Sequence, residues 1–106
     1  MNKKGRVKRL LEEISLNNDK VVDVYTLDTC PSCKSIKNKF DKLGVNYVTT
    51  DVNEDSDKWG DLVSETGEEF VPQITVNGKA IKDFENVNEL LSKTITEMIG
   101  RKIILK

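Results

Sequence analysis

Cys30 and Cys33 are the only two cysteines of the 106-residue chain, which contains no histidine. Two thiols separated by Pro31 and Ser32 can close a small disulfide ring and reopen it, which is the requirement for thiol–disulfide exchange. Without histidine, one chain cannot complete a zinc site from His and Cys ligands, and histidine-based triads are excluded. The cysteine pair is therefore the chemistry to explain.

The pair lies where a strand is expected to pass into a helix. Residues 21–27 are dense in β-branched and aromatic side chains, which predicts a buried central strand. After the motif, Ile36, Phe40 and Leu43 continue a helical face, and Gly44 supplies a C-terminal stop. A CxxC pair beside a strand–helix–strand pattern is typical of redox motifs.

The expected position of Cys30 at a helix N-terminus assigns the two thiols different roles. Unpaired backbone N–H groups and the positive end of the helix dipole favour the thiolate form of Cys30. Pro31 suits the first helical position because its missing N–H is not needed there. We expect Cys30 to attack a substrate disulfide and Cys33, one turn later and more buried, to attack the resulting mixed disulfide. In a glutathione system a second route exists, in which glutathione rather than Cys33 resolves Cys30.

Two other interpretations of the cysteines remain open. In the first, the two cysteines are small residues of the hydrophobic core. In the second, they supply half of the ligands of a metal site shared between two chains. The strand–CxxC–helix context favours redox chemistry over both, and no metal is expected.

The rest of the chain predicts three more helices and three more strands. A helix is expected over residues 7–14, a strand over 45–50 and a helix over 54–66 with Trp59, Leu62 and Val63 inward. Residues 71–76 and 79–81 flank Asn77-Gly78, which is the signature of a hairpin. Residues 86–89 form a capping-box start for a final helix that ends at Gly100.

Length and charge define the class of molecule. The chain forms a single domain, with residues 1–20 as an N-terminal helical extension and residues 21–106 as the redox domain. A net charge of −1 gives no support to nucleic-acid binding. No run of about 18 apolar residues exists, so no membrane span is expected. We expect a cytoplasmic monomer, in which a CxxC pair is catalytic rather than a structural crosslink.

Two charged segments have open interpretations. The acidic stretch of residues 51–69 is a solvated helix face or a surface for docking a partner. The N-terminal helix either packs on the domain or presents a basic patch to a partner.

A set of residues and short motifs follows one characteristic order and spacing along the chain. They are Val24-Tyr25-Thr26, Thr29-Cys30-Pro31-Ser32-Cys33-Lys34, Phe40, Gly44-Val45, Asp51, Thr66-Gly67, Val71-Pro72-Gln73-Ile74, Asn77-Gly78-Lys79 and Ile81. Through these residues the sequence resembles the glutaredoxins over roughly residues 21–99. The resemblance implies a thioredoxin-like α/β fold, with three α/β/α layers, a four-stranded mixed sheet and, here, an extra N-terminal helix. It also implies dithiol activity, glutathione as reductant or substrate, and a cis peptide before Pro72.

Val71 and Pro72 are expected to form a platform for substrate. A strand opening at this point would place the Val71 backbone beside Cys30, where an extended cysteine-containing peptide can pair with it. An ordinary trans proline at a strand start is the alternative.

Several positions depart from the family pattern around the motif. Leu27 replaces the usual Lys three residues before the first cysteine, and Asp28 adds a negative charge. A cation there would stabilise the Cys30 thiolate and hold a glutathione carboxylate. Lys34 and Lys37 either compensate for this loss or form a solvated helix face. Ser32 stands where an aromatic residue is common.

Further departures lie before the last expected helix. Lys82-Asp83 replaces paired glycines that let the γ-glutamyl end of glutathione approach the backbone. Glu85 and Asn86 follow, and Asn86 stands where an Asp usually receives the glutathione amine. Asn86 as the helix N-cap is the alternative. Phe70 precedes Val-Pro where a Thr is frequent.

We therefore expect a glutathione-dependent thiol–disulfide oxidoreductase that reduces protein disulfides or glutathione mixed disulfides. Cys30 and Cys33 are its expected catalytic residues. One alternative is a thioredoxin-like electron donor, for example to ribonucleotide reductase, that is reduced by a flavoprotein reductase. Others are a module that holds an iron–sulfur cluster or metal between subunits, and a redox-inactive adaptor. The expected residues for substrate and glutathione binding are Pro31, Ser32, Lys34, Lys37, Val71, Pro72, Glu85 and Asn86.

Overall fold

The computed structural model describes the backbone of residues 3–100 and the side chains of residues 9–100. In this part of the chain the helices are α1 (Lys3–Leu16), α2 (Pro31–Leu43), α3 (Ser56–Thr66) and α4 (Val87–Ile99). The strands are β1 (Val22–Thr26), β2 (Val48–Asp51), β3 (Gln73–Val76) and β4 (Lys79–Ala80). The helices and strands follow one another in the order that the sequence predicts.

The four strands form one mixed sheet in the order β2-β1-β3-β4. β1 pairs with β2 in parallel and with β3 antiparallel, and β3 pairs with β4 antiparallel. Every residue of β1 is buried, as a continuous apolar run in an inner strand predicts. The expected four-stranded mixed sheet is confirmed, with β1 leading directly into the cysteine motif.

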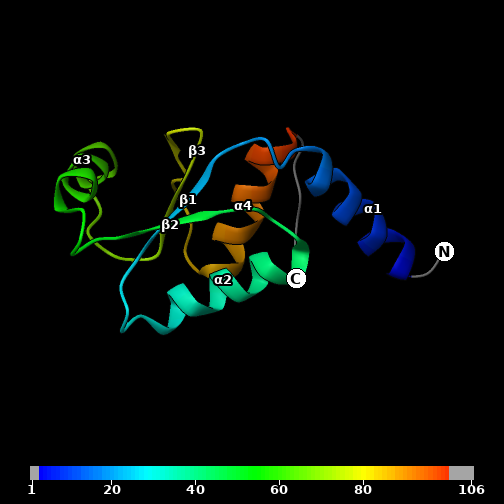
Figure 1. The fold of residues 1–106 in the computed structure, drawn as a ribbon, viewed down its shortest axis with the longest axis horizontal. Helices are drawn as coiled ribbons and strands as arrows, with labels where there is room; N and C mark the ends of the chain where they lie inside the picture. Colours follow the sequence, from blue (N-terminus) through cyan, green and yellow to red (C-terminus); the bar gives the residue numbers. More distant parts are fainter. Residues whose placement is uncertain (1–2, 101–106) are drawn as a thin grey trace.

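Helices cover both faces of the sheet (Figure 1). Val22 and Val24 point to one face, where Ile36 and Phe40 of α2 pack together with residues of α4. Tyr25, the next residue along β1, points to the opposite face, where Leu62 of α3 belongs to a second, smaller cluster. This alternation follows from the period-2 geometry of a strand and gives the three expected layers.

α1 extends from the body of the domain but is anchored at its C-terminal end (Figure 1). Ile14 is fully buried in the larger core cluster, and Leu10 packs against it. In the following turn, the Asn18 side chain donates to the Gly44 carbonyl and accepts from the Asn46 N–H, both at 3.0 Å. The Lys20 ammonium donates to the Met98 carbonyl at the end of α4. Residues 18 and 20, which follow α1, are thus tied to the segment after α2 and to the end of α4.

The expected strand over residues 45–50 is wrong for its first half, because β2 begins only at Val48. Gly44 ends α2 in the left-handed conformation, with φ 75°, and the Val45 N–H donates to the Phe40 carbonyl at 3.0 Å. This hydrogen bond satisfies a carbonyl of the last helical turn and turns Val45 into the core. Val45 therefore belongs to the C-terminal cap of α2 and does not pair in the sheet.

The start of α3 also differs from its expected start at about Glu54. The Asp51 carboxylate accepts from the Asn53 and Glu54 N–H groups, which holds these residues in a turn. Asp55 then caps the helix by accepting from the Lys58 N–H at 3.2 Å. Local capping is thus one role of the acidic stretch. Within residues 3–100, no helix is long and apolar enough to cross a membrane.

Candidate active site

Cys30 is the N-cap residue of α2, with an extended backbone at φ −94° and ψ 107°. Its Sγ atom accepts a hydrogen bond from the Cys33 backbone N–H at 3.2 Å. Pro31 occupies the first turn, where the absence of its N–H costs no hydrogen bond. A sulfur at this position faces the positive end of the helix dipole, which stabilises negative charge on it. Cys30 is half-buried, so substrate can reach it.

Cys33 lies one turn further along α2 and is fully buried. Burial raises the pKa of the Cys33 thiol, and the neighbouring Cys30 thiol raises it further. Hydrogen bonds to the Thr26 side chain and the Leu27 backbone act in the opposite direction. Cys33 is therefore held as a protonated, inaccessible thiol while both cysteines are reduced, which suits a second nucleophile.

Val71 and Pro72 are distant from the cysteine motif along the chain but lie beside Cys30 in the fold. The Val71–Pro72 peptide bond is cis, and the Cys30 thiol contacts the Val71 carbonyl oxygen at 3.8 Å. Val71 is half-buried and packs against the smaller core cluster, as does Leu27. The Val71 backbone thus lies beside the Cys30 sulfur, two residues before β3 begins.

A groove of about 490 Å³ runs from this point toward α4. This volume lies in the range of ordinary small-molecule and peptide subsites. Its lining is mainly apolar, and it brings together five of the residues expected to bind substrate. The lining residues are Ser32, Phe70, Val71, Pro72, Phe84, Glu85, Asn86, Val87 and Leu90.

The far end of the groove is the N-terminus of α4. Asn86 caps this helix by accepting from the Glu89 N–H at 2.9 Å, and Glu89 Oε1 in turn accepts from the Glu85 N–H at 2.9 Å. The expected reciprocal cap is present, with Glu89 reaching one residue beyond the N-cap. The Asn86 side-chain oxygen therefore has a structural partner already, while the Glu85 carboxylate is exposed.

The remaining expected residues lie outside the groove. Lys34 is exposed and Lys37 half-buried on α2, and neither is among the residues that line it. Pro31 is exposed beside the sulfur. Lys82 and Asp83 border an adjoining hollow of about 170 Å³, and Asp83 has φ 62°, a left-handed conformation that favours glycine.

Comparison with known proteins identifies this arrangement. A model of the family described as Glutaredoxin matches residues 22–81, which is more than half of the chain. The chain belongs to the glutaredoxin family. The thioredoxin-like fold and the cysteine pair at the start of α2 agree with this membership.

Relatives with glutaredoxin names share part of the chain. Glutaredoxin-C6 of Oryza sativa subsp. japonica is 33% identical over 63 residues, covering 57% of this chain and 56% of the rice protein. The match thus spans little more than half of that relative. Glutaredoxin 3 of Escherichia coli K12 is 28% identical over 60 residues, covering 57% of this chain and 72% of that protein.

Solved glutaredoxins share the fold over nearly the whole chain. The structure of a buckwheat glutaredoxin–glutathione complex superimposes with a TM-score of 0.58, 24% identity and coverage of 93% of this chain and 91% of that chain. The holo form of glutaredoxin C1 from Populus tremula x tremuloides gives a TM-score of 0.58 at 23% identity, covering 89% and 90% of the two chains.

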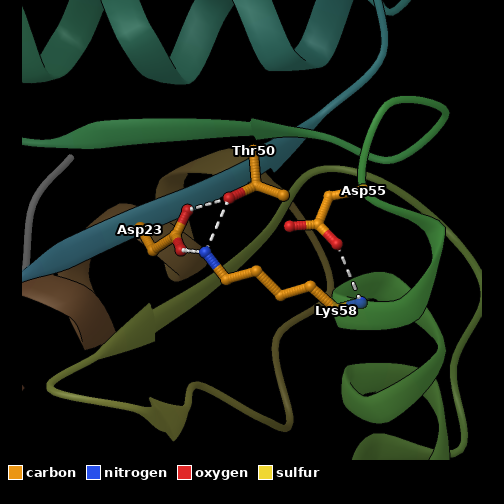
Figure 2. A network of polar contacts seen from close by, with 4 residues as sticks. All are labelled: Asp23, Thr50, Asp55 and Lys58. Atoms are coloured by element: carbon orange, nitrogen blue, oxygen red, sulfur yellow. Dashed lines mark hydrogen bonds and ion pairs between the residues drawn. The ribbon is translucent and has the colours of Figure 1, made fainter.

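One polar network within this glutaredoxin fold was not expected from the sequence (Figure 2). The Lys58 ammonium of α3 forms an ion pair with the buried Asp23 carboxylate of β1. It also donates to Thr50 Oγ1 at 2.9 Å, and Thr50 donates to Asp23 Oδ1 at 2.8 Å. The hydrogen bond to Asp23 raises the pKa of Lys58. The sequence feature that could have revealed this network is Asp23, an acidic residue inside a mostly apolar strand.

Side chains that could bind a metal ion are not clustered in the described part of the chain. Among those residues, no group of three or more His, Cys, Asp or Glu side chains could hold a metal ion. The buried Asp23 carboxylate is paired with Lys58 and Thr50.

Proposed function

We propose that this protein is a dithiol–disulfide oxidoreductase that reduces protein disulfides and glutathione mixed disulfides through Cys30 and Cys33. The observation that carries the proposal is the asymmetry of the pair. Cys30 is half-buried, its Sγ accepts a helix N–H, and it contacts Val71, which lines the groove, whereas Cys33 is fully buried. A family-wide redox role fits this geometry.

The proposed reaction transfers two electrons from the dithiol to the substrate. The Cys30 thiolate attacks one substrate sulfur, the substrate S–S bond breaks, and the leaving thiolate takes a proton from solvent. The Cys33 thiol then loses its proton and attacks Cys30 Sγ, which forms the Cys30–Cys33 disulfide and releases the second substrate thiol. Extended substrate can pair with the Val71 backbone during the first step.

Glutathione is the proposed reductant and co-substrate. Support comes from the buckwheat neighbour, which was solved as a glutathione complex, and from the groove that ends at Glu85 and Asn86. The exposed Glu85 carboxylate is suited to accept an ammonium group such as that of glutathione. We also propose that the protein acts in the cytoplasm and as a monomer. The cytoplasmic location follows from the proposed catalytic role, because a CxxC pair in a reducing compartment is mostly catalytic rather than a structural crosslink.

A second candidate is an electron donor that a flavoprotein reductase recycles, with ribonucleotide reductase as one class of acceptor. The half-buried Leu27 favours it, because this apolar side chain stands where a cation would hold a glutathione carboxylate. The two candidates differ in which reductant restores the dithiol rapidly.

Substitution of each cysteine tests the proposal. We expect Cys30→Ser to abolish reduction of both a protein disulfide and a glutathionylated protein, and Cys33→Ser to lose the first while retaining the second through glutathione. Full activity of Cys30→Ser would contradict the assignment. Titration of the oxidised protein with glutathione, and separately with a flavoprotein reductase and its nicotinamide cofactor, then distinguishes the two candidates. The reduction potential gives an independent check, with about −200 to −230 mV typical of glutaredoxins and about −270 mV of thioredoxin.

A further inference from the structure

Two phenylalanines form the wall of the groove beside Cys30. The rings of Phe70 and Phe84 meet edge to face, with 5.7 Å between their centroids and an interplanar angle of 86°. Phe84 packs against the larger core cluster, whereas Phe70 is 46% exposed. An exposed aromatic ring at the edge of a mainly apolar groove favours contact with another apolar group.

Hydrogen bonds fix the backbone that carries Phe70 and the backbone that precedes Phe84. The buried Gln73 amide donates to the carbonyl of Glu68 at 2.9 Å and to that of Phe70 at 3.0 Å, which fixes the loop that carries Phe70. On the other side, the Lys93 ammonium donates to the Lys82 and Asp83 carbonyls. The wall is therefore preorganised, which lowers the entropic cost of binding.

The charge around the wall indicates what kind of ligand fits. Among the described residues that line the groove, Glu85 is the one that carries a charge. The adjoining hollow, which Phe70 and Phe84 also border, adds Glu68, Lys82 and Asp83. The acidic excess disfavours an acidic polypeptide segment and favours a neutral or basic one.

Resting on the proposed function, we infer that the groove selects polypeptide disulfides in which a large apolar side chain adjoins the attacked cysteine. The Cys30 sulfur lies at the Val71 carbonyl, and Val71 also lines the groove. A substrate strand paired there places the residue next to its cysteine against Phe70 and Phe84. The electron transfer is unchanged: the substrate disulfide gives two thiols and the protein dithiol gives one disulfide.

The test compares peptide disulfides that differ at one position. Three homodimeric peptide disulfides carry Leu, Ser or Asp beside the cysteine and are otherwise identical. Each is mixed with prereduced full-length protein in a single turnover, and the released thiol is followed. We expect the Leu peptide to react roughly tenfold faster than the Ser peptide, the scale at which apolar pockets discriminate. The Asp peptide is expected to be the slowest.

Variants locate the preference in the wall. Phe70→Ser is expected to bring the Leu-to-Ser rate ratio close to one, and Phe84→Leu to reduce it partly. Leu16→Ala removes an apolar side chain that is 82% exposed on α1 and is the matched control, with an unchanged ratio. Thermal unfolding of each variant confirms that it is folded.

The outcomes separate this inference from the function on which it rests. Equal rates for the Leu and Ser peptides in the unsubstituted protein, or a ratio that survives Phe70→Ser, would overturn the selectivity and leave the oxidoreductase activity standing. If none of the peptides were reduced, the proposed function itself would fail.

Discussion

The Cys33 backbone N–H donates to the Sγ atom of Cys30, with 3.2 Å between nitrogen and sulfur. This donor belongs to the first turn of α2, whose N–H groups have no partner within the helix. The two cysteines are thus linked through the backbone while both remain thiols. Since the same turn buries the Cys33 side chain, Cys30 Sγ is the accessible sulfur of the pair and Cys33 Sγ is the inaccessible one.

The first prediction concerns the reactivity of the two thiols. We expect iodoacetamide to alkylate Cys30 more than tenfold faster than Cys33 in the reduced, folded protein at pH 7. Cys33 is fully buried and its pKa is raised, so less of it is thiolate at a given pH than for an ordinary cysteine. Its alkylation should increase as the pH rises toward that raised pKa. Peptide mass mapping over pH 6–10 measures both rates, and equal labelling at pH 7 would contradict the assigned roles.

The second prediction concerns the ion pair between α3 and β1. Lys58→Met leaves the buried Asp23 carboxylate without its cation and should lower the free energy of unfolding by about 1–3 kcal/mol. Urea unfolding measures the loss. Lys42→Met, at an exposed position on α2, is the control and should change stability by less than about 0.5 kcal/mol.

A companion substitution separates charge from packing at this site. Adding Asp23→Val to Lys58→Met removes the unpaired carboxylate, so we expect most of the lost stability to return. A double variant as unstable as Lys58→Met alone would show that the ion pair is not the cause.

The third prediction concerns the two interpretations of Asn86. Because its side-chain oxygen accepts the Glu89 N–H, Asn86→Ala should cost about 1 kcal/mol of stability. Asn86→Ser keeps a capping oxygen and should retain nearly full stability. If Asn86 also binds glutathione, the Ser variant will show a raised KM for a glutathionylated substrate; an unchanged KM assigns Asn86 to capping alone.

The fourth prediction concerns Leu27, three residues before Cys30. Leu27→Lys places a cation near the motif, where it should favour the Cys30 thiolate and attract a glutathione carboxylate. We expect roughly a tenfold faster reaction with a glutathionylated substrate at pH 6, measured in a single turnover. Leu27→Met, which preserves the apolar contact with the smaller core cluster, is the matched control. No gain in the Lys variant would mean that the cation does not reach the site.

Short-range patterns in the sequence were sufficient to predict most of the fold. The alternation of apolar residues and the Asn77-Gly78 turn give a four-stranded sheet with helices on both faces, and they place Cys30 at a helix start. The boundary at Val45 could not be predicted in this way, since a β-branched residue after Gly44 suits a strand as well as a helix cap. The hydrogen bond to Phe40, formed only when the helix has ended, decides between them.

The sequence by itself determined that the chain carries one cysteine pair and no histidine, and its local pattern was enough to place that pair at a helix N-terminus. Only the tertiary structure decided what surrounds it. Phe70 and Phe84 are separated along the chain by two strands, and Asp23 and Lys58 lie 35 residues apart. Such contacts depend on how the sheet and helices pack in space, so no local pattern of residue types encodes them.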